Sequence, residues 1–162
     1  MKRKLHIETT VEVYDRIEQL PANEQALLYA ARAALPAAYA PYSGFRVSAA
    51  LLLANGAVLT GTNYENAAYP MCLCAERVAL GAAHAQFPGV PVQAIAITVA
   101  NAQKTATQPA APCGACRQVL CETEQRFGQT IRIVLQGETG DIYVLQSGQD
   151  LLPLSFSGHF LH

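Results

Sequence analysis

The stretch MCLCAERVAL, residues 71–80, is the most informative part of the sequence, because two thiols and two opposite charges precede an apolar run. The small and apolar residues that follow Arg77 predict a helix from about Cys74 to Ala85. Core packing needs neither the thiols nor the charges. The stretch therefore predicts a functional site at the N-terminus of this helix.

The remaining sequence predicts a single α/β sheet with helices on its faces. Pro36 should kink or loosen the end of the first helix, and Asn55-Gly56 is typical of a tight hairpin turn. In chain order we expect a helix over 22–39, hairpin strands on either side of 55–56, a helix over 74–85, a strand over 92–100, a helix over 114–127, and strands over 131–136 and 141–145.

The N-terminal residues show a weaker pattern, in which Leu5, Ile7, Val11 and Val13 roughly alternate with polar residues. Such alternation indicates a short extended arm or an edge strand. We therefore divide the chain into an N-terminal arm, residues 1–21, and a single domain, residues 22–162.

Composition narrows the possible partners. The chain has 162 residues, a formal net charge of −1 and no basic run beyond residues 2–4, which argues against a nucleic-acid polymer as partner. Its apolar runs are too short and interrupted to cross a bilayer, and no apolar signal segment follows the N-terminus. We expect a cytoplasmic protein, in which five reduced cysteines indicate a metal site or catalysis before disulfides.

A second cysteine-headed helix begins at PCGAC, residues 112–116. Cys113 and Cys116 are three residues apart and therefore face the same way on a first helical turn. With a third cysteine at another helix start, the set predicts three thiolates around Zn²⁺ and one open position, as in catalytic zinc sites. Cys74 is the expected third ligand, because Arg77 lies on its face of the helix.

The two charges then acquire roles. Arg77 is expected to donate hydrogen bonds to a thiolate, and Glu76 to transfer protons beside the open position. The alternative for this pair is a surface ion pair on the helix. The alternative for Cys113 and Cys116 is a thiol redox pair. Cys72 and Cys121 are expected to be small buried residues without a role.

CAER at 74–77 together with PCGAC at 112–116 resembles the zinc-dependent cytidine deaminase superfamily. The segments AYAPYSGFRVSAALL, GTNYENAAYP and LLPLSF are similar to those of its small homotetrameric members, which act on free nucleosides. The resemblance implies a three-layer α/β/α fold with a five-stranded mixed sheet. It also implies one Zn²⁺ per chain, a homotetramer, and hydrolytic deamination of cytidine and 2′-deoxycytidine.

The resemblance also implies roles for individual residues. Glu76 would be the catalytic acid and base, and one loop and two aromatic residues would complete the substrate site, partly across a subunit boundary. The residues implied are Asn63 and Glu65 for the ribose, Phe45 against the nucleoside, Ala67 and Tyr69 in the loop, and Phe156 reaching a neighbouring subunit's site.

Two further functions remain open from the sequence. A deaminase of blasticidin-type antibiotics shares the cysteine motifs, although the full NYENAAYP loop favours cytidine. A structural zinc protein would need a fourth ligand, for which Cys72 and His84 are the candidates. The four histidines are scattered along the chain and are expected to have no role: His6, His84, His159 and His162.

Overall fold

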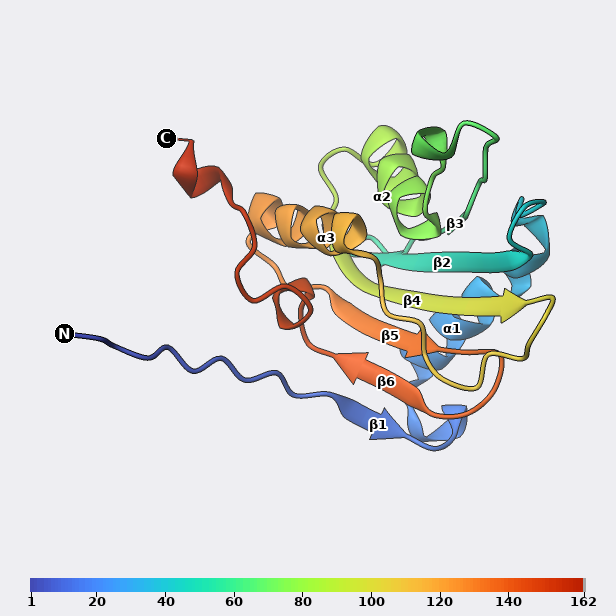
Figure 1. Cartoon of the computed structure of the whole chain (residues 1–162), viewed down its shortest axis with the longest axis horizontal. Coiled ribbons are helices and arrows are strands. Elements are labelled where there is room, and N and C mark those ends of the chain that lie inside the picture. The colour runs from blue at the N-terminus through green and yellow to red at the C-terminus, as the bar shows by residue number, and fades with distance from the viewer. Residues whose placement is uncertain (162) are drawn as a thin grey trace.

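The structure is a computed structural model that describes residues 1–161, so His162 lies outside the described residues. One mixed sheet lies between helix α1 on one face and helices α2 and α3 on the other (Figure 1). The helices are α1 (Ala22–Ala34), α2 (Ala75–Gln86) and α3 (Gly114–Phe127), and the strands are β1 (Glu12–Tyr14), β2 (Phe45–Leu53), β3 (Val58–Thr62), β4 (Val92–Asn101), β5 (Arg132–Gln136) and β6 (Ile142–Leu145).

The sheet has the strand order β1-β6-β5-β4-β2-β3, with β4 and β5 parallel and every other neighbouring pair antiparallel. The predicted three-layer α/β/α fold is confirmed, but the sheet has six strands rather than five. The extra strand is β1, which the N-terminal alternation indicated only as one of two possibilities. It is fixed by an ion pair between Glu12 and Arg132, two residues far apart in sequence.

Two separate cores hold the layers together. On the α1 face, buried Leu27, Leu28 and Ala31 pack against the small and branched residues of β2, β4, β5 and β6. On the other face, buried alanines of α2, including Ala75 and Ala79, allow the helix to lie close to the sheet. The long apolar strands predicted from the sequence are therefore central, because both of their faces are buried.

The strand directions explain why the two cysteine-headed helices begin at one edge of the sheet. Both β3 and β4 run antiparallel to β2, so they point the same way. The chain leaves β3 through a loop into α2, and it leaves β4 through a second loop into α3. Segments that follow such strands meet at the same edge of an α/β sheet.

The predicted effect of Pro36 is confirmed. Helix α1 ends at Ala34, and Leu35–Ala37 form a single 3₁₀ turn. Within residues 1–161, no helix is long and apolar enough to cross a membrane.

The approach of β3 to α2 depends on Gly61, and substitution of this residue should displace the helix. A Cβ atom at Gly61 would lie 2.5 Å from the backbone nitrogen of Ala79 and 2.6 Å from the carbonyl oxygen of Ala75. We expect Gly61→Ala to lower the free energy of unfolding, measured by urea denaturation, by about 1–3 kcal/mol.

The matched control is Gly81→Ala, because Gly81 lies within α2 and a Cβ atom there meets nothing within 4 Å. This change should stabilise the protein by up to about 1 kcal/mol, since alanine favours the helix. Equal effects of the two substitutions would contradict the close approach.

Candidate metal centre and substrate pocket

Three thiols converge where helices α2 and α3 begin. Cys74 is the residue before α2, Cys113 is the residue before α3, and Cys116 lies on the first turn of α3. The Sγ atoms of Cys74 and Cys113 are 3.8 Å apart, those of Cys113 and Cys116 are 3.5 Å apart, and all three lie within 4.8 Å of one another. All five cysteines are free thiols.

These distances fit a zinc ion. Sulfur atoms at about 2.3 Å from zinc in a tetrahedral arrangement are about 3.8 Å from each other. Among residues 1–161, this is the one group of three or more metal-ligating side chains whose donor atoms lie so close together. Three cysteines leave one of the four zinc positions without a protein ligand, which is the arrangement of catalytic sites.

The pKa values of the three thiols also indicate a site that binds a cation. Burial raises the pKa of Cys74, and burial together with the negative charge of Glu76 raises the pKa of Cys116. For Cys113, burial opposes ionisation, but hydrogen bonds from the Cys116 backbone and from the neighbouring thiols lower the pKa. Two of the three thiols are therefore poor thiolates by themselves, and a bound metal supplies the charge that ionises them.

Arg77 interacts with the thiol cluster rather than with Glu76. Its Nη2 atom donates to the carbonyl oxygen of Cys72 at 3.3 Å and lies 3.9 Å from the Sγ of Cys74. The two ion pairs found within residues 1–161 both involve Arg132. The alternative of a surface ion pair between Glu76 and Arg77 is therefore wrong.

Glu76 lies on the first turn of α2 and lines a pocket beside the thiols, with only 4% of its surface exposed. Its charge raises the pKa of the Cys116 thiol, which reflects their proximity. A buried carboxylate at the mouth of a metal site, without an ion-pair partner, is well placed to accept and release protons.

The loop between β4 and α3 is held by the turn between β5 and β6. Glu138 accepts hydrogen bonds from the backbone nitrogens of Asn101 and Ala106, both at 3.0 Å, which lower the pKa of its carboxyl group. A Cβ atom at Gly137 would lie 2.4 Å from the Ala106 carbonyl oxygen, so the two segments are in close contact. This packing sets the position from which Cys113 enters the site.

Arg117 also holds the backbone next to Cys113 in place, a role that the sequence analysis did not predict. Its Nε donates to the carbonyl oxygen of Pro112 at 2.8 Å, directly before Cys113. Its Nη1 donates to the carbonyl oxygen of Leu151 at 2.9 Å, in the C-terminal segment. The position of Arg117 one residue after the last cysteine of PCGAC was the available signal.

The pocket beside the thiols has a volume of about 310 Å³, at the lower end of the range typical of small-molecule sites. Its walls come from the start of β2, the loop after β3, the head of α2 and the loop before α3. Of the residues predicted for the site, the pocket contains Phe45, Asn63, Glu65, Cys74, Glu76 and Cys113.

Glu65 is fixed by the turn at Tyr42 and Ser43. Its carboxylate accepts from the backbone nitrogens of Tyr42 at 2.9 Å and Ser43 at 3.2 Å, and from the Ser43 hydroxyl. These hydrogen bonds, led by the one from the Ser43 hydroxyl, lower the pKa of Glu65, so it is ionised at neutral pH. No pattern in the sequence predicted this contact between Glu65 and the turn.

Asn63 is anchored to β2 rather than left free in the pocket. Its Oδ1 accepts from the backbone nitrogen of Val47 at 2.8 Å, and its Nδ2 donates to the carbonyl oxygen of Phe45 at 2.9 Å. One N–H of the amide remains for a ligand.

The other predicted residues lie outside this pocket. Tyr69 is exposed and lines a neighbouring depression that also contains Glu65 and Cys72, and its ring packs edge-on to Tyr42 with centroids 6.3 Å apart. Ala67 is exposed, and so is Phe156, which stacks on Phe160. A single chain therefore does not bring Ala67, Tyr69 and Phe156 to the thiols.

Neither candidate for a fourth zinc ligand joins the three thiols. The Sγ of Cys72 accepts from the backbone nitrogen of Asn66 at 3.2 Å. His84 lies on the last turn of α2, where its Nδ1 is 2.9 Å from the Nη1 of Arg126. Cys121 is fully buried, as expected, whereas Cys72 is only half-buried, so the expectation of burial is wrong for Cys72.

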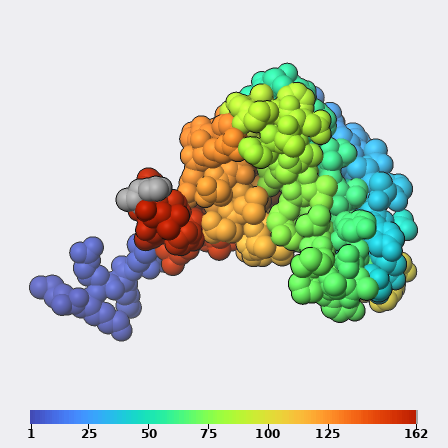
Figure 2. Space-filling view, turned by 90° about the horizontal axis from the view of Figure 1, so that it is seen from above, coloured from blue at the N-terminus to red at the C-terminus, as the bar shows by residue number. Residues whose placement is uncertain are grey.

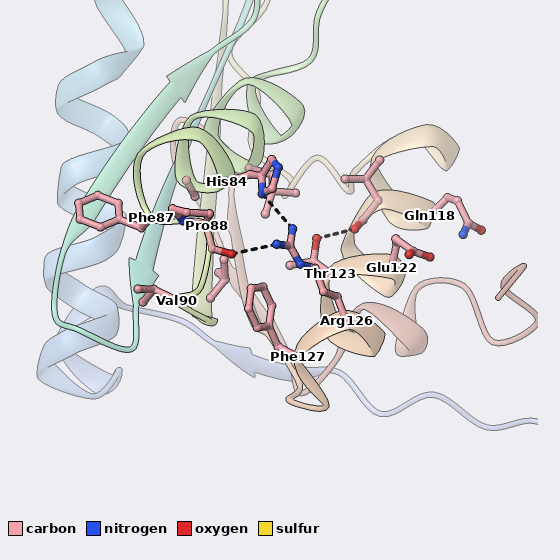
Figure 3. Close-up of a pocket in the computed structure, with 13 residues that line it drawn as sticks. His84, Phe87, Pro88, Val90, Gln118, Glu122, Thr123, Arg126 and Phe127 are labelled. Carbon is pink, nitrogen blue, oxygen red and sulfur yellow. Dashed lines mark hydrogen bonds between the residues drawn. The ribbon is translucent and has the colours of Figure 1, made fainter. Parts of the chain in front are cut away.

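A second pocket, of about 280 Å³, lies between the C-terminal halves of α2 and α3 (Figure 3). Its walls are mainly apolar, and its polar rim includes His84, Glu122 and Arg126. It contains no cysteine, and it lies toward the opposite ends of the helices from the thiols. The metal centre and this pocket are therefore separate.

Comparisons with known proteins agree with this geometry. Residues 21–129 match the family model of the cytidine and deoxycytidylate deaminase zinc-binding region. A cytidine deaminase from Halalkalibacterium halodurans is 41% identical over 135 residues, which cover 83% of this chain and 95% of the relative. The crystal structure of cytidine deaminase from Burkholderia pseudomallei superposes with a TM-score of 0.71 at 44% identity, covering 85% of this chain and all of that chain. That of Mycobacterium tuberculosis gives a TM-score of 0.65 at 32% identity, with 85% and 99% covered.

The ligand assignment can be tested by zinc content. Serine at Cys74, Cys113 or Cys116 removes one of three protein ligands, so each variant should lose its zinc during dialysis while the native chain keeps one zinc per chain. The matched control is Cys72→Ser, which should keep zinc because its thiol lies outside the cluster. Loss of zinc from the control, measured by elemental mass spectrometry, would contradict the assignment.

Proposed function

The chain belongs to the cytidine and deoxycytidylate deaminase family with its zinc-binding region, and we propose that it converts free cytidine and 2′-deoxycytidine to uridine and 2′-deoxyuridine with release of ammonia. The observation that carries this proposal is the placement of buried Glu76 in a pocket beside three converging thiols. An antibiotic deaminase of blasticidin type would use the same centre and is the alternative substrate to assay.

Cys74, Cys113 and Cys116 are the proposed zinc ligands. When bound, zinc supplies Lewis acidity, which makes water a competent nucleophile near neutral pH. Arg77 and the N-termini of α2 and α3 place positive charge beside the thiolates, which offsets the excess negative charge of a three-cysteine site.

Glu76 is the proposed proton carrier. Its carboxylate removes a proton from the attacking water and delivers it to N3 of the cytosine ring, which makes C4 more electrophilic. It then takes the proton of the hydroxyl group formed on C4 and passes it to the amino group, which leaves as ammonia while the C4 carbonyl forms. Alternation between the charged and neutral forms lets one carboxylate perform both transfers.

Glu65 and Asn63 are proposed to hold the ribose. A carboxylate has about four acceptor sites, and three hydrogen bonds occupy Glu65, so one site remains for a sugar hydroxyl. Because Glu65 is ionised, it also repels a 3′-phosphate, which favours free nucleosides over polynucleotides. Phe45, which lines the same pocket, is proposed to pack against the nucleoside.

We further propose a homotetramer that works in the cytoplasm. Phe156 is 57% exposed although its backbone is held by Gln118, whose amide bonds both its nitrogen and its carbonyl oxygen. An aromatic ring presented outward in this way fits a role in a neighbouring subunit's site, together with the exposed residues Ala67 and Tyr69. The boundary between an arm at 1–21 and a domain at 22–162 remains part of the same proposal.

Replacing the proposed proton carrier tests the mechanism. Glu76→Gln keeps the shape of the side chain but cannot accept a proton, so kcat for cytidine should fall by about 10²–10⁴-fold or more. Turnover is followed by the ultraviolet absorbance change on formation of uridine. The variant should keep its zinc, because Glu76 is not a ligand, and Glu122→Gln is the matched control with unchanged kcat. Retention of more than about a tenth of the native kcat would rule out this role.

The ribose contact is tested with 3′-deoxycytidine. A lost hydrogen bond to a charged group costs about 1.5–3 kcal/mol, so the native enzyme should prefer cytidine by at least about tenfold in kcat/KM. Glu65→Ala should reduce this preference to near unity, because both substrates then lack the contact. An unchanged preference in Glu65→Ala would show that another residue reads the 3′-hydroxyl.

A further inference from the structure

The first fourteen residues, here called the leading segment, are extended, and the last three of them form strand β1, which has one free edge. Only the part Glu12–Tyr14 is paired, and it is paired on one side, with β6. Residues 1–11 continue from it and project away from the body of the protein (Figures 1 and 2). One side-chain hydrogen bond, from the Thr9 hydroxyl to the carbonyl oxygen of Asp150 at 3.0 Å, ties this part to the domain. A free strand edge with unpaired backbone groups is a template for another strand.

One face of the leading segment is apolar and uncovered. Val13 pairs with Tyr143, which packs in the core under α2 and α3, so Val13 lies on that face of the sheet. The helices do not cover β1, and Val13 is 55% exposed. Leu5, Ile7 and Val11 are exposed as well and share its spacing of two.

The end of the leading segment that joins the domain is held by side-chain contacts of Glu12 and Tyr14 on the opposite face of the sheet. Arg132 donates to Glu12 at 3.0 Å and also to Glu24, a buried carboxylate at the start of α1. The Tyr14 hydroxyl donates to Glu12 at 2.9 Å. The carboxylates of Glu12 and Glu24 thus share one guanidinium, so this end of the leading segment carries excess negative charge.

The charges along the leading segment are divided between its two ends. Lys2, Arg3 and Lys4 are positive, whereas Glu8 and Glu12 are negative. Two such segments attract each other when they run antiparallel and repel each other when they run parallel. We propose that the leading segment pairs antiparallel with the leading segment of a second copy of this chain.

The charges also select a register for this pairing. Antiparallel strands centred on Ile7 place Lys2 of one copy opposite Glu12 of the other, and His6 opposite Glu8. Ile7 then faces itself, and the apolar rows of the two copies become neighbours on one face. Backbone pairing across this centre would satisfy the hydrogen-bonding groups of the free edge.

A cysteine placed at the centre tests the pairing directly. In the zinc-loaded full-length chain, Ile7→Cys should form a disulfide-linked dimer rapidly in oxidised glutathione, because the two introduced thiols are directly opposite. Leu5→Cys is the matched control, since its two thiols would be four residues apart along the strand, or about 13 Å. Non-reducing electrophoresis should show crosslinking at least about tenfold faster for Ile7→Cys, and peptide mass spectrometry should find the introduced thiols joined to each other.

Charge reversal supplies the second arm of the experiment. Lys2→Glu with Lys4→Glu, added to Ile7→Cys, should slow the crosslinking at least about threefold at low salt, and 1 M salt should reduce the difference. Equal crosslinking of Ile7→Cys and Leu5→Cys, or no effect of charge reversal, would overturn the proposal. Sedimentation of the native chain with anionic lipid vesicles, lost on deletion of residues 1–10, would overturn it in favour of a membrane surface. The crosslinking does not depend on deaminase activity, so its failure leaves the proposed function intact.

Discussion

The convergence of two helix N-termini at one edge of the sheet is the constraint on which the site depends. Cys74 and Cys113 each stand immediately before a helix, and their Sγ atoms are 3.8 Å apart. That distance requires β3 and β4 to run in the same direction and α2 to lie close to the sheet, which the absence of a side chain at Gly61 permits. The packing of small residues thus sets the geometry of the metal centre.

The electrostatics of the site follow from the same arrangement. Burial alone would leave Cys74 and Cys116 protonated, and a metal ion with two helix N-termini and Arg77 supplies the positive charge that favours thiolates. Because Arg77 bonds the thiol cluster, Glu76 is left without an ion-pair partner in the pocket. A buried carboxylate without an ion-pair partner is suited to the repeated proton transfer that hydrolytic deamination requires.

Local patterns in the sequence predicted the helices, the hairpin and the convergence of Cys74, Cys113 and Cys116. The second cysteine helix was predicted over 114–127, and α3 has those bounds, because PCGAC marks its start and Gly128 its end. Non-local contacts were not predictable. The sixth strand depends on Arg132 pairing with Glu12, and the lowered pKa of Glu65 depends chiefly on the hydrogen bond from Ser43. No sequence periodicity reports which distant residues meet, so these parts required the structure.

The central claim is that three thiolates hold zinc and leave its fourth position open, and zinc-edge X-ray absorption tests it most directly. The account predicts a first shell of three sulfur atoms at about 2.3 Å and one oxygen atom at about 2.0–2.2 Å. Four sulfur atoms, or three sulfur atoms with an imidazole nitrogen, would show that Cys72 or a histidine closes the site. Such a result would contradict a catalytic centre and indicate a structural one.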